Sequence, residues 1–475
     1  MSAYEISIGL ETHVMQQTQS KMFCSCRYEY GAAPNTHVCP VCVGYPGALP
    51  VLNKKAIELC VKAGLLLNCD INLFSRWDRK NYFYPDMAKN YQVTQADHPL
   101  CGEGFVHVEV NGETKEITIE RIHQEENAAK NTHTKEGSLI DYNRAGTALM
   151  EIVTTPCMHS TEEVLAYMNA IKQIMQYGQI SNCDQEKGQM RSDVNISVRP
   201  NGHKELGAKV EIKNMNSFAF IVEAIDYEVE RQISLLESGG EVQQETRGYD
   251  SDRKETFVQR TKEDAHDYRY FPEPDLLPLV LEEAQVFQWK AELPELPSSR
   301  KKRYIDQYGL PAYDAALITA DKTLSDWFDG VLDHTTFAKR ASNLMMGEMM
   351  RLLSETNLHL HEIRITPQML GQLVNMIEAG KISMGAGKQV FEILFHEGGD
   401  PEAIVEEKGL GQVSNDDDLE RWANEAIEQH PKPVSEYQAG NAASINFLMG
   451  QVMKASRGKA NPAAVMQMLK EKLDA

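Results

Sequence analysis

Four of the nine cysteines lie close together, in a spacing that suits a tetrahedral metal site. They form two pairs separated by twelve residues: Cys24 and Cys26, then Cys39 and Cys42. Two thiolate pairs that are each presented by a short turn can bind zinc, and four thiolate ligands leave no open position for catalysis. The sequence therefore predicts a structural zinc site, with four reduced cysteines in a loop-rich segment as the alternative.

Carboxylates and a histidine occur in predicted strands, where they could bind a divalent cation. Glu11 and His13 are two residues apart in a strand predicted over residues 4–14, so their side chains share one face. Glu151 interrupts the apolar run 149–153, where a carboxylate is costly unless it is paired or binds a metal. A solvated outer strand face is the alternative interpretation.

A further acidic pair, Glu125 and Glu126, follows a predicted hairpin with strands at 105–110 and 117–122 and a turn at Asn111-Gly112. Carboxylates that converge on one point repel one another, and a hard divalent cation relieves that repulsion. Either of these two glutamates could join such a cation site.

Other polar residues alternate with apolar ones or lie among aromatic side chains. They are Arg79, Lys80, Arg191, Asp193, Asn195 and Glu211. The chain has no Walker phosphate loop and no Gly-x-Gly-x-x-Gly fingerprint. Any use of ATP would therefore need a sheet that clamps the phosphates through metals and side chains.

Strands and helices mix without a regular βαβ rhythm, which predicts an α+β fold. Helices are predicted at 161–177, after the capping box that Ser160 begins, and at 217–239. Proline-rich and glycine-rich breaks predict three parts. These are a large first domain over 1–293 with the zinc-binding loop, a helical domain over 294–400, and a small helical tail over 401–475.

The composition is that of an ordinary globular protein, with 42 % hydrophobic residues and a formal net charge of −21. No run of about 18 apolar residues and no signal peptide is present, so we expect a cytoplasmic protein that does not bind membranes. The net charge argues against a protein that coats nucleic acid such as DNA, but a local basic patch can still bind an anionic partner. Residues 431–475 carry six bases and three acids, so this segment is the predicted place for an anionic partner.

Several long motifs resemble the GatB family, the B subunits of glutamine-dependent aspartyl/glutamyl-tRNA amidotransferases. They are Ile8-Gly-Leu-Glu-Thr-His13, Cys39-Pro-Val-Cys42, Asp78-Arg-Lys-Asn-Tyr-Phe-Tyr-Pro-Asp86, Arg144-Ala-Gly-Thr147, Glu211-Ile-Lys-Asn214, Asp267-Tyr-Arg-Tyr-Phe-Pro-Glu-Pro-Asp275 and Gly450-Gln-Val-Met-Lys454. The resemblance covers essentially the whole chain, and the four cysteines match the zinc-bearing branch of the family.

The resemblance implies a cradle-shaped first domain similar to glutamine synthetase and guanido kinases. It also implies a tail that binds tRNA, and the predicted contacts are Lys454, Arg457 and Lys459. It implies that ATP phosphorylates the side-chain carboxylate of Glu-tRNA(Gln) or Asp-tRNA(Asn). Ammonia from glutamine then displaces the phosphate, and its source is the partner amidase (the A subunit), in a complex that also holds the small C subunit. By this resemblance magnesium and the phosphates lie among Glu11, His13, Glu125 and Glu151, with Glu126 a rival to Glu125, and the polar residues above bind ATP.

A protein of another class would share part of this pattern. It would be a non-catalytic, zinc-stabilised scaffold that only binds tRNA through its tail. Such a scaffold has no reason to place Glu11, His13 and Glu151 on strand faces that point inward.

Overall fold

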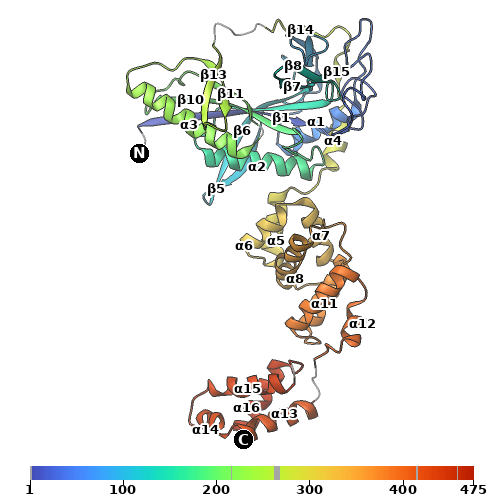
Figure 1. The fold of residues 1–475 in the computed structure, drawn as a ribbon, viewed down its shortest axis with the longest axis vertical. Coiled ribbons are helices and arrows are strands. Elements are labelled where there is room, and N and C mark those ends of the chain that lie inside the picture. Colours follow the sequence, from blue (N-terminus) through green and yellow to red (C-terminus); the bar gives the residue numbers. More distant parts are fainter. Residues whose placement is uncertain (1–2, 216, 262–267, 413–415, 457, 475) are drawn as a thin grey trace. The chain divides into compact units, whose positions relative to one another are not determined.

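The chain divides into two compact units, Met1–Leu296 and Pro297–Ala475 (Figure 1). The division falls a few residues after the predicted boundary at 293. The computed structural model describes residues 3–215, 217–261, 268–412, 416–456 and 458–474.

A large sheet forms the centre of the first unit. Its strands are β1 (Tyr4–Met15), β5 (Gly104–Val110), β6 (Glu113–Glu126), β9 (Ala148–Thr154), β10 (Met190–Pro200), β11 (Val210–Met215), β12 (Glu245–Asp250) and β13 (Glu255–Thr261). Their order is β13-β12-β11-β10-β1-β9-β6-β5. The one parallel pair is β11 with β12, and the other neighbours are antiparallel. The predicted α+β class is confirmed.

The central strand β1 shows why this sheet has two different faces. Ile8 and Leu10 are fully buried, whereas Glu11 and His13 belong to the opposite face. Three helices cover the apolar face: α1 (Lys54–Leu66), α2 (Thr161–Tyr177) and α3 (Phe218–Glu237). In Figure 1, α2 and α3 lie along that face below the strands. Burial of the apolar face stabilises the unit and leaves the polar face for chemistry.

Two elements that local sequence signals predicted are present in the structure. Asn111 and Gly112 have φ values of 52° and 84°, which suits the tight primed turn between β5 and β6. Helix α2 has the predicted bounds, and the Ser160 side chain accepts a hydrogen bond from the Glu163 amide at 3.3 Å. The capping box is not reciprocal, because the Glu163 carboxylate accepts the His159 amide at 2.8 Å instead.

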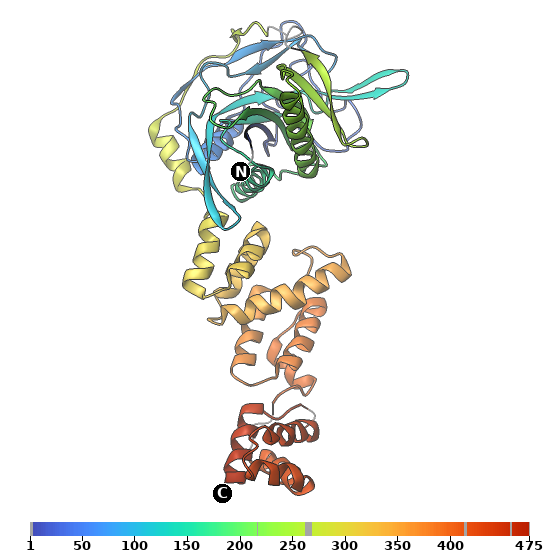
Figure 2. The same cartoon turned by 90° about the vertical axis from the view of Figure 1, so that its left-hand side faces the viewer.

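Shorter elements complete the first unit. They are β2 (Phe74–Ser75), β3 (Asp78–Asn81), β4 (Tyr91–Thr94), β7 (Lys130–Thr134), β8 (Gly137–Asp141), β14 (Phe271–Pro272), β15 (Leu279–Val280) and α4 (Glu283–Ala291). Strands β14, β3 and β4 form one small sheet, and β7 pairs with β8 in a hairpin that projects from the unit in Figure 2.

The second unit is helical. Its elements are α5 (Pro297–Tyr308), α6 (Ala312–Thr319), α7 (Lys322–Leu332), α8 (Ala338–Leu344), the π-helix Met345–Met349, α9 (Met350–Thr356), α10 (Pro367–Glu378), α11 (Met384–Glu397), α12 (Pro401–Glu407), α13 (Asp416–Gln429), α14 (Pro431–Gln438), α15 (Ser444–Ala455) and α16 (Pro462–Asp474). They form two apolar cores, one within 304–405 and one within 419–473. Ile404 and Val405 of α12, which fall within the predicted tail over 401–475, belong to the first core. None of the helices among the described residues is long and apolar enough to cross a membrane.

Candidate active site

A polar cavity lies on the open face of the large sheet and has a volume of about 400 Å³. The strand register explains its composition, because Glu11 lies opposite Asp193, and His13 lies between Glu151 and Arg191 on the two neighbouring strands. The cavity is lined by Glu11, His13, Lys80, Tyr82, Asp86, Gln92, Thr94, Gln95, Ala96, Arg121, His123, Glu125, Ala128, Arg144, Glu151, Arg191, Asp193, Lys213 and Tyr270. The predicted residues Glu11, His13, Glu125 and Glu151 are thus brought together.

The first ligand group within this cavity consists of His13, Glu125 and Glu151, whose ligand atoms lie within 4.8 Å of one another. His13 Nε2 lies 3.4 Å from Glu125 Oε1 and 3.3 Å from Glu151 Oε2. His123 adds a second imidazole, with Nε2 3.3 Å from Glu151 Oε2. Buried carboxylate and imidazole groups at this spacing suit a divalent cation.

A second ligand group lies beside the first and consists of Glu11, Asp193 and Glu211, again within 4.8 Å. Asn195 donates from Nδ2 to Glu11 Oε1 at 2.9 Å, while its buried Oδ1 has no hydrogen-bond partner among the described residues. Lys213 Nζ lies 2.8 Å from Glu211 and 3.4 Å from Asp193. The oxygen-rich donor set fits a hard cation.

The electrostatics of the two groups differ. Burial raises the pKa of Glu11, and the nearby Glu151 carboxylate raises it further. Burial also acts to raise the pKa of Glu151, but His123 and His13 outweigh it and hold that pKa well below its ordinary value. Burial lowers the pKa of His123, yet Glu151 and Glu125 prevail and raise it to about 9. Carboxylates and imidazoles therefore stabilise one another's charged forms.

Cationic side chains face these acids across the cavity. Arg144 is held by the main chain of the segment after β6, because its guanidinium donates to the carbonyls of Ala128 at 3.0 Å and Ala129 at 2.8 Å. The guanidinium of Arg191 makes no hydrogen bond or ion pair with the described residues. Lys80 Nζ lies 4.8 Å from the centre of the Tyr268 ring. An unpaired guanidinium beside carboxylate clusters can bind phosphate or carboxylate groups of a ligand.

Arg79, which was predicted to bind ATP, does not line this cavity. Its Nε and Nη2 donate to the two oxygens of Glu273 at 2.7 and 2.8 Å, and its guanidinium lies 4.1 Å from the centre of the Tyr91 ring. Successive residues of β3 point to opposite sides, so Lys80 faces the cavity while Arg79 faces away. Arg79 therefore stabilises the small sheet.

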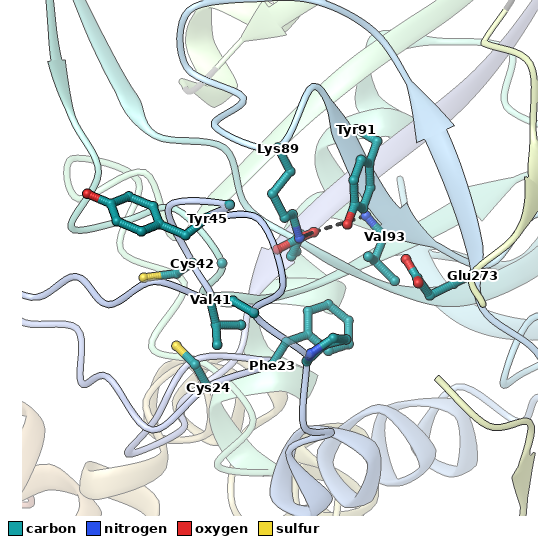
Figure 3. A pocket seen from close by; sticks show the side chains of 14 residues that line it. Phe23, Cys24, Val41, Cys42, Tyr45, Lys89, Tyr91, Val93 and Glu273 are labelled. Carbon is teal, nitrogen blue, oxygen red and sulfur yellow. Dashed lines mark hydrogen bonds and ion pairs between the residues drawn. The ribbon is translucent and has the colours of Figure 1, made fainter. Parts of the chain in front are cut away.

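Glu126 also departs from its predicted place among the magnesium ligands. Its carboxylate pairs with Lys89 and accepts the Val93 amide at 3.0 Å. It lines a second cavity of about 80 Å³, in which Figure 3 shows Lys89 and Tyr91 on one side and the cysteine loop on the other. Because Glu125 and Glu126 alternate along β6, only Glu125 points to His13.

The four cysteines lie together beside this second cavity, with their sulfur atoms within 4.8 Å of one another. Cys39 and Cys42 Sγ are 3.9 Å apart, and tetrahedral zinc with four sulfur ligands places sulfur atoms about 3.8 Å apart. A hydrogen bond from Cys24 lowers the pKa of Cys42 to about 4, whereas burial raises the pKa of Cys26 to about 11. The four thiols therefore fit the predicted zinc site.

The C-terminal residues predicted to contact tRNA lie on and beside α15. Lys454 and Lys459 are exposed and make no ion pair within the described part of the chain, and Arg457 lies outside the described residues. Helix α16 begins at Pro462, and the preceding Asn461 Oδ1 accepts the Ala463 amide at 2.9 Å.

Several residues of the main cavity had no predicted role, and His123 and Arg144 are two of them. His123 precedes Glu125 by two residues in β6, so the two side chains share a face. The strand was predicted only as far as residue 122, so this shared face was not predicted. Arg144 gave no comparable signal, because its place depends on a loop that meets β6 only in the folded chain.

The chain is similar to known proteins of one family. Residues 6–287 match the GatB/GatE catalytic domain family, and residues 326–473 match the GatB domain family. Relatives named as the B subunit of aspartyl/glutamyl-tRNA(Asn/Gln) amidotransferase occur in Thermoanaerobacter pseudethanolicus (50 % identical, covering 99 % of each chain) and Caldicellulosiruptor bescii (49 %, covering 99 % of each). A third, in Carboxydothermus hydrogenoformans, is 46 % identical and covers 100 % of this chain and 99 % of its own.

Proposed function

Because the chain belongs to the GatB family, we propose that it is the component that amidates glutamate or aspartate misacylated onto tRNA. The substrate is Glu-tRNA(Gln) or Asp-tRNA(Asn), and ATP activates the side-chain carboxylate. Ammonia comes from glutamine hydrolysed by the partner amidase (the A subunit), with the small C subunit in the same complex. The products are Gln-tRNA or Asn-tRNA, ADP and phosphate.

The proposed reaction has two steps. One oxygen of the side-chain carboxylate attacks the γ-phosphorus of ATP, the bond from that phosphorus to the bridging oxygen breaks, and ADP leaves. The nitrogen of ammonia then attacks the carboxyl carbon of the acyl phosphate, the bond to the phosphate oxygen breaks, and the nitrogen loses a proton as phosphate leaves. Phosphoryl transfer of this kind depends on alignment and charge neutralisation more than on covalent help from the protein.

One observation carries this proposal. The two ligand groups, which are rich in carboxylates, lie side by side at one cavity that cationic side chains also line. His13, Glu125 and Glu151 would hold one magnesium ion, and Glu11, Asp193 and Glu211 a second divalent cation. When bound, magnesium neutralises phosphate charge. Arg79 and Glu126, which the structure directs elsewhere, are not part of this proposal.

The remaining side chains of the cavity would bind and orient the substrates. Arg191 and Lys80 would contact phosphate oxygens, and Lys213 would keep Glu211 and Asp193 in place, as it does in this structure. Asn195 would keep Glu11 in its orientation through the 2.9 Å hydrogen bond. A cation-binding sheet face of this kind needs no phosphate loop.

Two further sites belong to the proposal. Zinc at Cys24, Cys26, Cys39 and Cys42 would stabilise the first unit. The exposed lysines Lys454 and Lys459 would contact tRNA phosphates. A zinc-stabilised scaffold without catalysis would account for these two sites, but it gives no reason for two buried carboxylate groups in one cavity.

The direct test measures phosphate release from ATP labelled in the γ-position by the purified complex, with and without Glu-tRNA(Gln). We expect release that depends on the misacylated tRNA and that His13→Ala abolishes, while His107→Ala, an exposed histidine on β5, leaves it unchanged. Release that is independent of the tRNA, or that His13→Ala leaves intact, would contradict the proposal.

A further inference from the structure

Lys21 is a buried lysine three residues before the first cysteine of the cluster, and 1 % of its surface is exposed. Its Nζ donates to the carbonyl oxygens of His37 at 2.9 Å and Tyr142 at 3.2 Å, and it lies 3.5 Å from Cys42 Sγ. An ammonium group has three N–H donors, so each has an acceptor within the protein.

Burial of a lysine is costly unless a negative charge lies nearby. Carbonyl groups contribute hydrogen bonds but no charge, and Cys42 is the one thiolate-forming group in contact with Lys21 Nζ among the described residues. Four thiolates around a zinc ion sum to a net charge of about −2. The buried ammonium and this anionic centre therefore compensate each other.

The hydrogen bonds of Lys21 also connect two separate segments. The loop between the two cysteine pairs lies against residues 140–143, where the His37 amide donates to Asn143 Oδ1 at 2.8 Å and the Tyr142 amide donates to Asn35 Oδ1 at 2.7 Å. Residues 140–143 lead directly into Arg144, which lines the main cavity.

We propose that Lys21 is a positioning residue that holds the zinc-binding cysteines to the segment carrying Arg144. It binds the Cys42 thiolate with one donor and a carbonyl from each of the two segments with the others. The cysteine centre is thereby joined to the wall of the main cavity. This inference goes beyond the proposed amidation and rests on metal binding by the four cysteines.

The test compares Lys21→Met, which keeps the length of the side chain, with Lys54→Met, an exposed lysine at the start of α1. The complete complex is loaded with cobalt, whose absorption bands report the sulfur ligands, and release of the metal to a chelator is followed. Mutation of a residue that hydrogen-bonds to a metal ligand typically lowers the metal affinity by about 10–100-fold. We expect Lys21→Met to shift the bands and to release cobalt at least about ten times faster, while Lys54→Met behaves as the unchanged protein.

A second measurement uses the unchanged sequence, in case Lys21→Met fails to fold. Hydrogen exchange of the amides in 140–147 is compared before and after a chelator removes the metal. We expect faster exchange in the stripped protein, because the Tyr142 and Asn143 contacts lose their fixed partner. Exchange that stays unchanged, or cobalt release from Lys21→Met at the original rate, would overturn the role of Lys21. A wild-type complex without any bound metal would instead refute the cysteine site on which the inference rests.

Discussion

His13 and Glu151 face each other across two neighbouring antiparallel strands, and His13 Nε2 lies 3.3 Å from Glu151 Oε2. The same Glu151 oxygen is 3.3 Å from Nε2 of His123 on the next strand. One carboxylate thus lies between two imidazoles, which gives Glu151 the central place in the first ligand group.

Replacement of this carboxylate is expected to stop amidation. Glu151→Gln keeps the shape of the side chain and removes the charge that balances the two imidazoles, so we expect turnover to fall by at least about 100-fold. Binding of tRNA should survive, because the helical tail is untouched. Turnover with Glu-tRNA and a filter-binding assay measure the two quantities. Glu113→Gln, at an exposed position of β6, serves as the control, and equal loss of both quantities would indicate misfolding instead.

The neighbouring glutamates of β6 are expected to behave differently. Glu125→Gln should weaken magnesium binding. Glu126→Gln should leave magnesium binding unchanged but leave the Lys89 ammonium, 13 % exposed, without its partner. The expected loss is about 3 kcal/mol in the free energy of unfolding. Lys89→Met in the same chain should restore part of that stability, and denaturant titration of the single and double variants measures the coupling.

Two arginines allow a matched comparison in ATP binding. We expect Arg191→Met to raise the KM for ATP by at least about ten-fold, because it removes a charged hydrogen-bond donor of the cavity. Arg79→Met should leave that KM unchanged and cost about 2 kcal/mol of stability, because Glu273 loses its two hydrogen bonds. Initial rates at varied ATP and thermal unfolding separate the two effects. A raised KM for ATP in Arg79→Met, with an unchanged KM in Arg191→Met, would instead place Arg79 in the ATP site.

Loss of one cysteine is expected to release the metal. In Cys39→Ser the three remaining thiolates bind zinc more weakly, so metal analysis should fall from one equivalent to nearly none. The unfolding temperature of the first unit should fall with it. Cys157→Ser, outside the cluster, should retain the full equivalent. A wild-type protein that contains no zinc would contradict this prediction.

The basic tail is expected to contribute to tRNA affinity through charge. The double variant Lys454→Ala, Lys459→Ala should raise the KM for tRNA. In a plot of log KM against the logarithm of the salt concentration, its slope should be smaller by about 1–2. Turnover at saturating tRNA should change little. The control is the double variant Lys290→Ala, Lys339→Ala, which removes two exposed lysines outside the tail and should leave the KM and the slope unchanged. Unchanged affinity and slope would place tRNA on another surface.

The main acidic residues of the cavity could be predicted from the sequence, but the full set of residues that line it could not. Alternation in a strand is local, so Glu11 and His13 could be assigned to one face in advance. The side on which β3 meets the cavity depends on its pairing with β4 and β14, so the sequence alone did not separate Arg79 from Lys80. The two cysteine pairs were predictable because four thiolates need only short turns to meet, whereas the contact of Arg144 with the loop after β6 is a property of the folded chain.

The central position of β1 has a consequence for synthesis of the protein. Strand β1 precedes the other strands of this sheet along the chain and pairs with β10, and the hydroxyls of Thr12 and Ser192, 180 residues apart, meet at 3.0 Å. At about 5–20 residues per second, translation takes roughly 10–40 s to supply that partner. The other neighbour of β1, strand β9, is made before β10. Until β10 follows, β1 therefore keeps one unpaired edge, which a chaperone that shields nascent strands would cover. The order of strands in the finished sheet thus sets the time at which the first unit can fold during translation.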